Sequence, residues 1–378
     1  MTICFFSAQY LPTPGGVERY TWNLARRCVQ EGGRAIVVTS ALPGLPDRER
    51  DPDGIEIYRL PVFPVMKGRF PVLRPGPALR RLTRQLWQEP IDFCVIQTRM
   101  YTESLWAARA ARRRGLPALV IDHSTGYMPM GGGLPGLAGR LYEQLACRVV
   151  RSAGYPFYGV SRAVCRWLEQ FGIRAAGCLP NAVDPDALAA EQARDPIDWR
   201  KTLGLPAGTF LVAFAGRLIP EKGAGELARA VAGLEGAALA VAGDGPEARA
   251  LTDAGAHLLG ALPHHRVVQL FAQADCCCLP TRYAEGFPTT LLEAAACGCP
   301  IVCTPTAGTE ELLPGPDYGI LLPDTRPETI RRALAGVRDD PAAAAKRAER
   351  VRRHLGEHFT WDAVFATIKA IAAGRADG

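Results

Sequence analysis

The two residues in this chain whose types and spacing best suit a chemical role are Glu285 and Glu293. Seven residues separate them, and they flank the start of a predicted helix. Pro288, Thr289 and Thr290 are residue types suited to an N-cap and a first helical turn. We therefore expect Glu285 to lie in the preceding loop and Glu293 to lie about one turn inside the helix.

The first turn of this predicted helix offers backbone N–H groups near Thr290, Leu291 and Leu292 that have no partner within the helix. Such groups form an anion site, because the helix dipole also places positive potential there. Such a site would suit a sugar diphosphate, because the backbone amides would bind the phosphates and the two carboxylates would bind hydroxyl groups on either side. An ordinary capped amphipathic helix with solvated acids explains the helix, taken alone, equally well.

A second segment places two cations in a loop. The apolar run Phe210–Ala215 is typical of a buried parallel strand, and Arg217 and Lys222 follow it between Gly216 and Gly223. Arginine binds phosphate oxygens through its fork and lysine as a point charge. Lysine is rare here, occurring only at positions 67, 201, 222, 346 and 369. Composition alone is therefore a poorer explanation for a lysine in this loop. Surface solubility would still explain either cation taken by itself.

Together these motifs resemble the family-4 retaining glycosyltransferases. The family pattern G-R-x4-K-G matches the loop with Arg217 and Lys222, and the pattern E-x7-E matches Glu285 and Glu293. Further landmarks follow in order: Val160-Ser161, Asn181-Ala182-Val183-Asp184, Ala242 to Pro246, Leu259 to Pro263, and Gly298 to Val302. The resemblance spans nearly the whole chain. Ala182 replaces a usual glycine, and Thr306-Ala307-Gly308 varies a common Gly-Gly turn, but neither departure touches the donor motifs.

The resemblance implies an α/β fold with two Rossmann-like doubly wound domains facing across a cleft, known as GT-B. It implies that Arg217 and Lys222 neutralise the departing diphosphate, Glu285 holds sugar hydroxyls, Glu293 holds the ribose diol and Leu262 meets the base through its backbone. The implied catalytic residues are Glu285, Arg217, Lys222 and His123, and the implied donor-binding residues are Gly16, Leu262, Thr289, Thr290, Leu291, Leu292 and Glu293.

Weaker signals lie in the first half of the chain. Pro14, Gly15 and Gly16 follow the first predicted strand and open a helix, so the backbone could approach a phosphate there, although such a turn is common. His123 follows the buried strand Ala118–Asp122, where a polar side chain faces a ligand crevice. Taken alone, His123 is more simply a satisfied structural histidine. The resemblance makes Gly16 a donor contact and His123 a ligand of the sugar or acceptor.

Strand and helix patterns alternate along the chain. The expected strands of a first sheet are 3–7, 35–39, 55–59, 93–97, 118–122 and 157–160, and those of a second sheet are 210–215, 237–242, 276–280 and 301–304. This alternation predicts two doubly wound parallel sheets with ligands at the carboxyl ends of their strands. We expect domains at 1–185 and 186–359 with a polar linker near 185–199, and the resemblance implies a last helix, 360–373, that returns to the first domain.

Composition agrees with a two-domain enzyme. A chain of 378 residues exceeds what one core usually organises, and 48% hydrophobic residues supply ample core. A net charge of +6 is too modest for a dedicated nucleic-acid binder, so we expect no nucleic-acid partner. The twelve cysteines lack metal-ligand spacing and resemble buried small hydrophobes, which predicts reduced thiols and no metal. We expect no signal peptide and no membrane-spanning run, hence a cytoplasmic enzyme.

Two segments have sequence patterns that fit more than one role. Residues 61–87 are rich in proline, aromatic residues and the cations Lys67, Arg69, Arg74, Arg80, Arg81 and Arg84. They fit a solvated face, an acceptor mouth or a patch that touches anionic membrane at the inner face of the cell membrane. Asp184 and Asp186 form an apparent D-x-D, the metal-nucleotide motif of the other main glycosyltransferase fold. Their place away from both phosphate motifs predicts a linker feature instead.

The resemblance therefore implies a retaining transferase that moves a hexose-type sugar from a nucleoside diphosphate sugar to an acceptor hydroxyl of a glycolipid or saccharide. We expect no cofactor. A nucleotide-sugar epimerase would share the architecture but would need an acid/base constellation that is not evident. A catalytically silent subunit of a glycan-assembly complex is a further alternative, against which the full set of donor motifs argues.

Overall fold

The computed structural model of the protein describes residues 1–13, 15–66, 68–128, 133–283 and 286–374. Of the residues singled out above, Pro14, Lys67 and Glu285 lie outside these ranges. The chain divides into unit 1, which comprises Met1–Pro180 and Trp361–Gly378, and unit 2, which comprises Asn181–Thr360. The expected boundary after residue 185 is therefore five residues too late.

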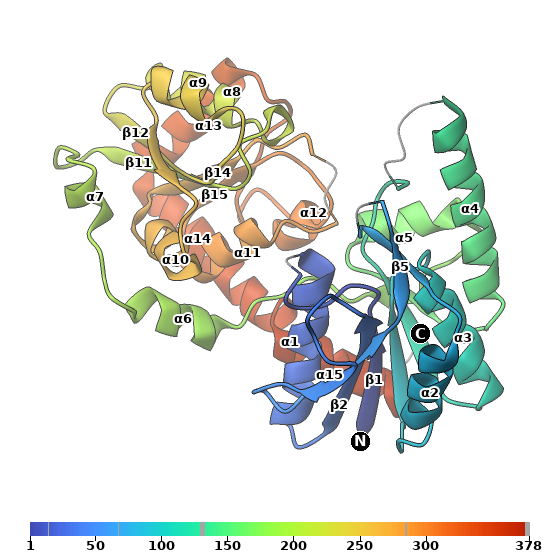
Figure 1. Ribbon diagram of the computed structural model, residues 1–378. Coiled ribbons are helices and arrows are strands. Elements are labelled where there is room, and N and C mark those ends of the chain that lie inside the picture. Colours follow the sequence, from blue (N-terminus) through green and yellow to red (C-terminus); the bar gives the residue numbers. More distant parts are fainter. Residues whose placement is uncertain (14, 67, 129–132, 284–285, 375–378) are drawn as a thin grey trace. The chain divides into compact units, whose positions relative to one another are not determined.

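Unit 1 is built on a mainly parallel sheet with strand order β10-β9-β8-β7-β1-β2-β4-β3 among the described residues (Figure 1). Its strands are β1 (Thr2–Phe6), β2 (Arg34–Ser40), β3 (Arg48–Arg50), β4 (Glu56–Leu60), β7 (Phe93–Gln97), β8 (Ala118–Asp122), β9 (Phe157–Gly159) and β10 (Gly177–Cys178). Only β3, among the described strands of this sheet, runs antiparallel to its neighbour. A separate antiparallel hairpin joins β5 (Val62–Val65) to β6 (Phe70–Leu73).

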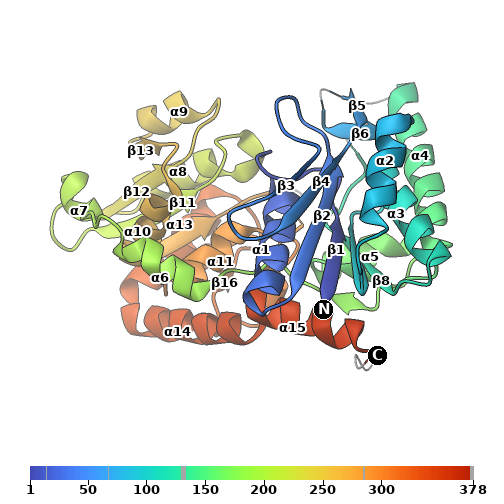
Figure 2. The same ribbon diagram turned by 60° about the horizontal axis from the view of Figure 1, so that its bottom comes forward.

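Helices cover both faces of this sheet (Figure 2). They are α1 (Gly16–Gln30), α2 (Pro77–Leu86), α3 (Thr102–Arg113), α4 (Gly133–Arg151), α5 (Arg162–Glu169) and α15 (Trp361–Ala372). Leu82 of α2, Ala107 of α3 and Val150 of α4 share one core cluster with Phe6 and Val38 of the sheet. Helices α1 and α15 pack against each other, so the C-terminal helix belongs to unit 1.

Unit 2 holds a parallel sheet with strand order β13-β12-β11-β14-β15-β16. The strands are β11 (Phe210–Ala215), β12 (Ala237–Ala242), β13 (His257–Gly260), β14 (Cys276–Leu279), β15 (Ile301–Cys303) and β16 (Ile320–Leu321). Every residue of β11 and β14 is buried. Both faces of these central strands are covered by helices, which explains why they are continuous apolar runs without alternation.

The helices of unit 2 pack on one another as well as on the sheet. They are α6 (Pro185–Ala193), α7 (Trp199–Thr202), α8 (Ala224–Ala232), α9 (Ala248–Asp253), α10 (His264–Gln273), α11 (Thr289–Ala296), α12 (Thr309–Leu312), α13 (Pro327–Asp339) and α14 (Pro341–His358), with a short 3-10 turn at Pro220–Lys222. Helix α8 packs on α13, whereas α10 packs on α6 and α11, and α11 packs on α14.

The expected polar linker at 185–199 is wrong. Most of it is helical, because Asp184 caps α6 by accepting a hydrogen bond from the N–H of Ala187, and Asp198 caps α7 in the same way through Lys201. The apparent D-x-D therefore contains an N-cap residue. Capping of this kind stabilises a helix by about 1 kcal/mol, and α6 then gains further stability by packing on α10.

Candidate functional site

The sheet of unit 2 has a topological switch point between β11 and β14. Strand β11 pairs with β12 on one side and with β14 on the other, so the chain leaves the two central strands in opposite directions. In doubly wound sheets, ligands bind outside the carboxyl ends of the strands at this point. The loop Gly216–Gly223 follows β11, and the segment that leads to α11 follows β14.

These loops are held together by their backbones. The N–H of Leu218 donates to the carbonyl of Asp244 at 2.9 Å, and the N–H of Arg282 donates to the carbonyl of Glu221 at 2.7 Å. Glycine permits the approach, because a Cβ atom on Gly243 would lie only 1.9 Å from the carbonyl oxygen of Gly216. The loop with the two cations is therefore fixed by its neighbours on both sides.

Arg217 and Lys222 both approach the ring of Tyr283. The guanidinium carbon of Arg217 lies 5.0 Å from the ring centroid, and Nζ of Lys222 lies 5.4 Å from it. Arg217 is exposed, whereas Lys222 is half-buried. Two cations on one aromatic ring concentrate positive charge at the switch point, and the ring contributes cation–π attraction to each. No sequence pattern indicated Tyr283, which reaches the cations only through the folded loop after β14.

Helix α11 begins as expected, with Pro288 at the N-cap and Thr289 as its first residue. Its entry is fixed by Asn181, whose side-chain amide donates to the carbonyl of Phe287 at 3.1 Å. Thr289 is exposed and Thr290 is half-buried, whereas Leu291 and Leu292 lie with their side chains in the core.

One part of the expected anion site needs correction. The N–H of Leu291 donates to the carbonyl of Pro288 at 3.2 Å, so it is already engaged. The turn at the N-cap tightens here, as helix starts often do. Leu292 is the fourth residue of α11, so its N–H pairs within the helix. The N–H groups of Thr289 and Thr290 remain the candidates for phosphate contact.

Glu293 lies inside α11, about one turn from its start, as expected. Its Oε1 atom is 3.2 Å from Nε2 of His264, the first residue of α10. Leu262 lies in the turn between β13 and α10, half-buried against the core of unit 2. The structure thus brings the carboxylate of Glu293 to His264, which lies two positions after Leu262 and which the sequence patterns did not indicate.

Unit 1 has its own switch point between β1 and β7. Strand β1 pairs with both β2 and β7. Gly16 opens α1 after β1, and a Cβ atom on Gly16 would meet no atom within 4 Å, so space for a ligand exists beside this backbone. His123 follows the neighbouring β8, and its Nε2 lies 2.8 Å from Oε1 of Gln97 at the end of β7.

His123 is held as a neutral imidazole. Burial lowers the pKa of His123 to about 4, against the opposing influence of the Asp122 charge. The ring packs edge-on against Tyr20 of α1 with centroids 4.8 Å apart. With Gln97 accepting at Nε2, the unprotonated Nδ1 is an acceptor that can receive a hydrogen bond from a hydroxyl group. His123 therefore offers a hydrogen-bonding group and no positive charge near neutral pH.

A buried ion cluster supports the segment that carries His123. Arg99 is fully buried, and its guanidinium donates to Asp122 at 2.7 Å and to Glu143 of α4 at 2.8 Å. Burial opposes ionisation of Asp122, but the charge and hydrogen bond of Arg99 outweigh it, and the pKa of Asp122 lies below its usual value. Glu143 also accepts from the N–H of Met128 at 2.6 Å, which ties the loop after β8 to α4.

The segment 61–87 divides between two surface features of unit 1. Its hairpin half lines a cavity of about 270 Å³ at the carboxyl ends of β1 and β2, where Val62, Arg69 and Pro71 meet Gln9 and Ser40. Its helical half lines a groove of about 740 Å³ between α2 and α3. That groove is lined by five arginines and two tryptophans, namely Arg80, Arg84, Arg109, Arg113, Arg114, Trp87 and Trp106, and by no acidic residue.

Comparison with known proteins agrees with this geometry. The family model described as glycosyltransferase family 4 matches residues 14–187, and the model described as glycosyl transferases group 1 matches residues 195–354. The chain belongs to the group 1, family-4 glycosyltransferases. The second model spans the cation loop, the turn of Leu262 and α11, and the first spans Gly16 and His123.

Relatives within this glycosyltransferase family include a D-inositol 3-phosphate glycosyltransferase of Catenulispora acidiphila. It is 27% identical over 96% of this chain and 92% of its own length. A putative teichuronic acid biosynthesis glycosyltransferase, TuaC of Bacillus subtilis, is 37% identical, but the match spans 36% of this chain and 34% of TuaC.

Among solved structures, Anabaena HepE in complex with UDP matches with a TM-score of 0.75 and 19% identity over 99% of this chain and 100% of HepE. This likeness confirms the expected GT-B fold with two Rossmann-like units. Among the described residues, no helix is both long enough and apolar enough to cross a membrane.

Proposed function

We propose that this glycosyltransferase transfers a hexose-type sugar, with retention of anomeric configuration, from a UDP- or GDP-sugar to an acceptor hydroxyl of a glycolipid or saccharide. The observation that carries the proposal is the placement of Arg217 and Lys222 around Tyr283 at the switch point of unit 2. Two fixed cations beside a helix N-terminus suit a diphosphate leaving group. The UDP complex of HepE supports a nucleotide donor.

In this proposal Arg217 and Lys222 neutralise the charge that develops on the diphosphate, and the N–H groups of Thr289 and Thr290 add to the same potential. Glu293 accepts from the ribose hydroxyls, with His264 orienting its carboxylate across the 3.2 Å contact. Glu285 holds sugar hydroxyls, and the backbone at Leu262 meets the base. In unit 1, Gly16 provides close approach to a phosphate, and neutral His123 hydrogen-bonds the sugar or the acceptor.

The chemistry proposed here uses no metal and no cofactor. The bond between the anomeric carbon and the diphosphate oxygen breaks, and the electron pair leaves with the diphosphate. The acceptor hydroxyl attacks the same face of the sugar, and its proton passes to the departing phosphate oxygen. Fixed positive charge at Arg217 and Lys222 stabilises that oxygen, as a divalent cation does in other transferases.

Two surfaces of unit 1 support an acceptor that is anionic or embedded in lipid. The first is the arginine groove between α2 and α3 described above. The second is a leucine stripe on α4, formed by Leu134, Leu137, Leu141 and Leu145, whose exposed fractions run from 83% to 51%. Their spacing of three and four residues places them on one helix face.

Arginines that attract anionic headgroups and leucines that enter the apolar layer form a suitable combination for peripheral contact with the cytoplasmic face of a membrane. Helices α2, α3 and α4 all cover the same face of the sheet of unit 1. The hairpin cavity of about 270 Å³ is the candidate mouth for the acceptor hydroxyl.

A thermal-shift screen of UDP-, GDP- and ADP-sugars tests the donor class, because a ligand that binds the folded state raises the melting temperature by mass action. We expect one nucleotide class to stabilise the wild type and to lose most of this effect in Lys222→Ala. Lys201→Ala is the matched control, since Lys201 is an exposed lysine on α7 of the same unit. Equal stabilisation of both variants by the preferred donor would contradict the proposal.

A further inference from the structure

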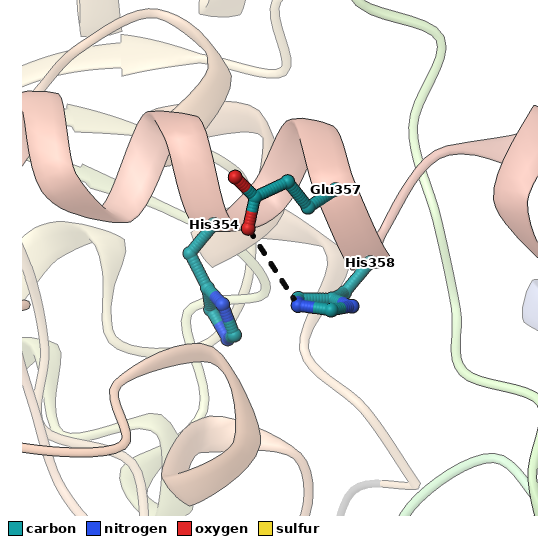
Figure 3. Close-up of side chains that lie close together, drawn as sticks. All are labelled: His354, Glu357 and His358. Atoms are coloured by element: carbon teal, nitrogen blue, oxygen red, sulfur yellow. Dashed lines mark ion pairs between the residues drawn. The ribbon is translucent and has the colours of Figure 1, made fainter.

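The last turn of α14 gathers three side chains with metal-binding atoms. His354, Glu357 and His358 occupy positions i, i+3 and i+4 of one helix, and one potential ligand atom of each lies within 4.8 Å of the others (Figure 3). Figure 3 shows the three side chains leaving the same side of the helix end. Two histidines four residues apart on a helix face provide two nitrogen ligands to one ion.

Hydrogen bonding selects the ligand atom of His354. Its Nε2 lies 2.9 Å from the backbone carbonyl of Glu311, and a carbonyl can only accept, so Nε2 carries the proton. Nδ1 is then the unprotonated nitrogen. Metal-bound histidines commonly donate their other N–H to a carbonyl in this way, which fixes both tautomer and ring. The ring is also held edge-on by Tyr318 and Phe359, with centroid distances of 5.4 and 5.5 Å.

The other two ligands are exposed and adjustable. Oε2 of Glu357 lies 3.8 Å from Nε2 of His358, and both side chains are more than half exposed. Ligand atoms on a tetrahedral zinc ion, with bonds of about 2.0–2.2 Å, are about 3.3–3.5 Å apart. Small rotamer changes of the two exposed side chains reach that spacing without moving the helix. The helix C-terminus adds negative potential, which favours a cation.

We propose that His354, Glu357 and His358 form a binding site for a divalent transition-metal ion of the zinc class, with water completing the coordination. Two imidazole nitrogens and one carboxylate suit zinc and its neighbours and do not suit magnesium or calcium, which prefer oxygen ligands. None of the three residues belongs to the proposed donor site, so this ion would have no part in sugar transfer.

The position of the site suggests a structural effect within unit 2. Directly after His358, the carbonyl of Phe359 accepts from the N–H of Val183 at 2.9 Å, and Thr360 pairs with Val183 as an isolated bridge. The two chain segments that border unit 2 are joined there. An ion on the last turn of α14 would hold the helix end that anchors this junction and so stabilise the folded state.

The test uses tag-free, chelator-treated full-length protein and zinc sulfate in isothermal titration calorimetry. We expect one zinc equivalent to bind wild type, and His358→Gln and Glu357→Gln to weaken binding by about 10-fold to 100-fold or more. These two residues are exposed, so the variants are expected to fold. His257→Gln, which alters a histidine on β13 outside the cluster, is the control and should bind zinc like the wild type.

A second measurement identifies the ligand nitrogens. In imidazole ¹⁵N NMR spectra, zinc should shift Nδ1 of His354 while its Nε2 keeps its proton. Zinc should also raise the melting temperature of the wild type more than that of His358→Gln. Absence of zinc binding, or binding that His358→Gln leaves unchanged because the ion sits on thiols elsewhere, would overturn the proposal.

Discussion

At the residue scale, the proposed function assigns separate tasks to the two acids of the predicted E-x7-E pair. Glu293 is a fixed member of α11 that contacts His264, whereas Glu285 lies in the segment before the helix and outside the described residues. Glu293 is proposed to bind the ribose hydroxyls, which the nucleotide carries whether or not the sugar is attached. Glu285 is proposed to contact only the sugar.

We expect Glu293→Ala to weaken binding of the free nucleoside diphosphate by about 1–3 kcal/mol, because a charge-assisted hydrogen bond is lost. Glu285→Ala should lower turnover more than it lowers affinity for that nucleotide. Calorimetry with the free nucleoside diphosphate, alongside steady-state rates, measures both effects. An equal loss of nucleotide affinity in the two variants would refute the division of tasks.

Lys222 supplies half of the fixed positive charge on Tyr283. Its replacement by alanine should reduce the transfer rate by a factor on the order of 10²–10³, the usual loss when one preorganised charge-stabilising group is removed. Lys201→Ala should keep the wild-type rate. A Lys222→Ala enzyme within a few-fold of wild type would show that the leaving group is stabilised by other residues.

The residues that sequence reasoning missed share one property. Tyr283, His264, Gln97 and Tyr20 lie far along the chain from their partners, and each meets its partner only after the loops fold. No spacing rule connects His264 with Glu293. The predicted residues, by contrast, were carried by local motifs whose geometry follows from a strand, a glycine turn and a helix start.

At the element scale, the strands were the most predictable part of the chain. Runs such as Phe210–Ala215 and Ala118–Asp122 are buried on both faces, so their apolar sequences are continuous and easily recognised. The hairpin of β5 and β6 was missed because each strand contains a proline and β5 is largely exposed. Helix α6 was missed because its cap and its packing on α10 outweigh a polar composition.

Helix α3 carries a buried acid with a testable pH signature. Glu103 is 2% exposed, and burial raises the pKa of its carboxyl group well above the usual 4.5, against the weaker opposing influence of the Ser7 backbone. The folded state therefore keeps the proton at pH values where the unfolded chain releases it. The contribution of Glu103 to the free energy of unfolding therefore falls as the pH rises from 4.5 toward the pKa that Glu103 has in the folded state.

Glu103→Gln removes this loss of stability at higher pH, because the side-chain amide stays neutral at all pH values. We expect the variant to gain stability over wild type as the pH is raised from about 5 to about 8. Urea unfolding at several pH values measures the difference. A constant difference across this range would show that Glu103 does not stay protonated in the folded state.

At the scale of the whole molecule, the two-unit division followed from chain length and from the alternation of strands and helices. The boundary itself was misplaced by five residues, because Asn181 and Val183 look like part of an exit segment yet bond to Phe287 and Phe359 of unit 2. Contacts between residues more than a hundred positions apart decide such a boundary, and no local pattern reports them.

Metal independence of catalysis is a prediction for the whole enzyme. We propose that Arg217, Lys222 and a helix N-terminus stabilise the negative charge of the leaving diphosphate. Excess EDTA should therefore leave the transfer rate unchanged. Zinc at the α14 cluster would be removed under the same conditions without effect on the rate. Loss of transfer with chelator and its return with manganese would contradict this account.

The most direct test of the central claim is the anomeric configuration of the product formed from the preferred donor. Proton NMR of the purified product reports the coupling at the new anomeric centre and compares it with the donor. We predict that the configuration of the donor is preserved, as expected for attack on the face from which the diphosphate leaves. An inverted product would contradict the proposed mechanism, even if transfer were efficient.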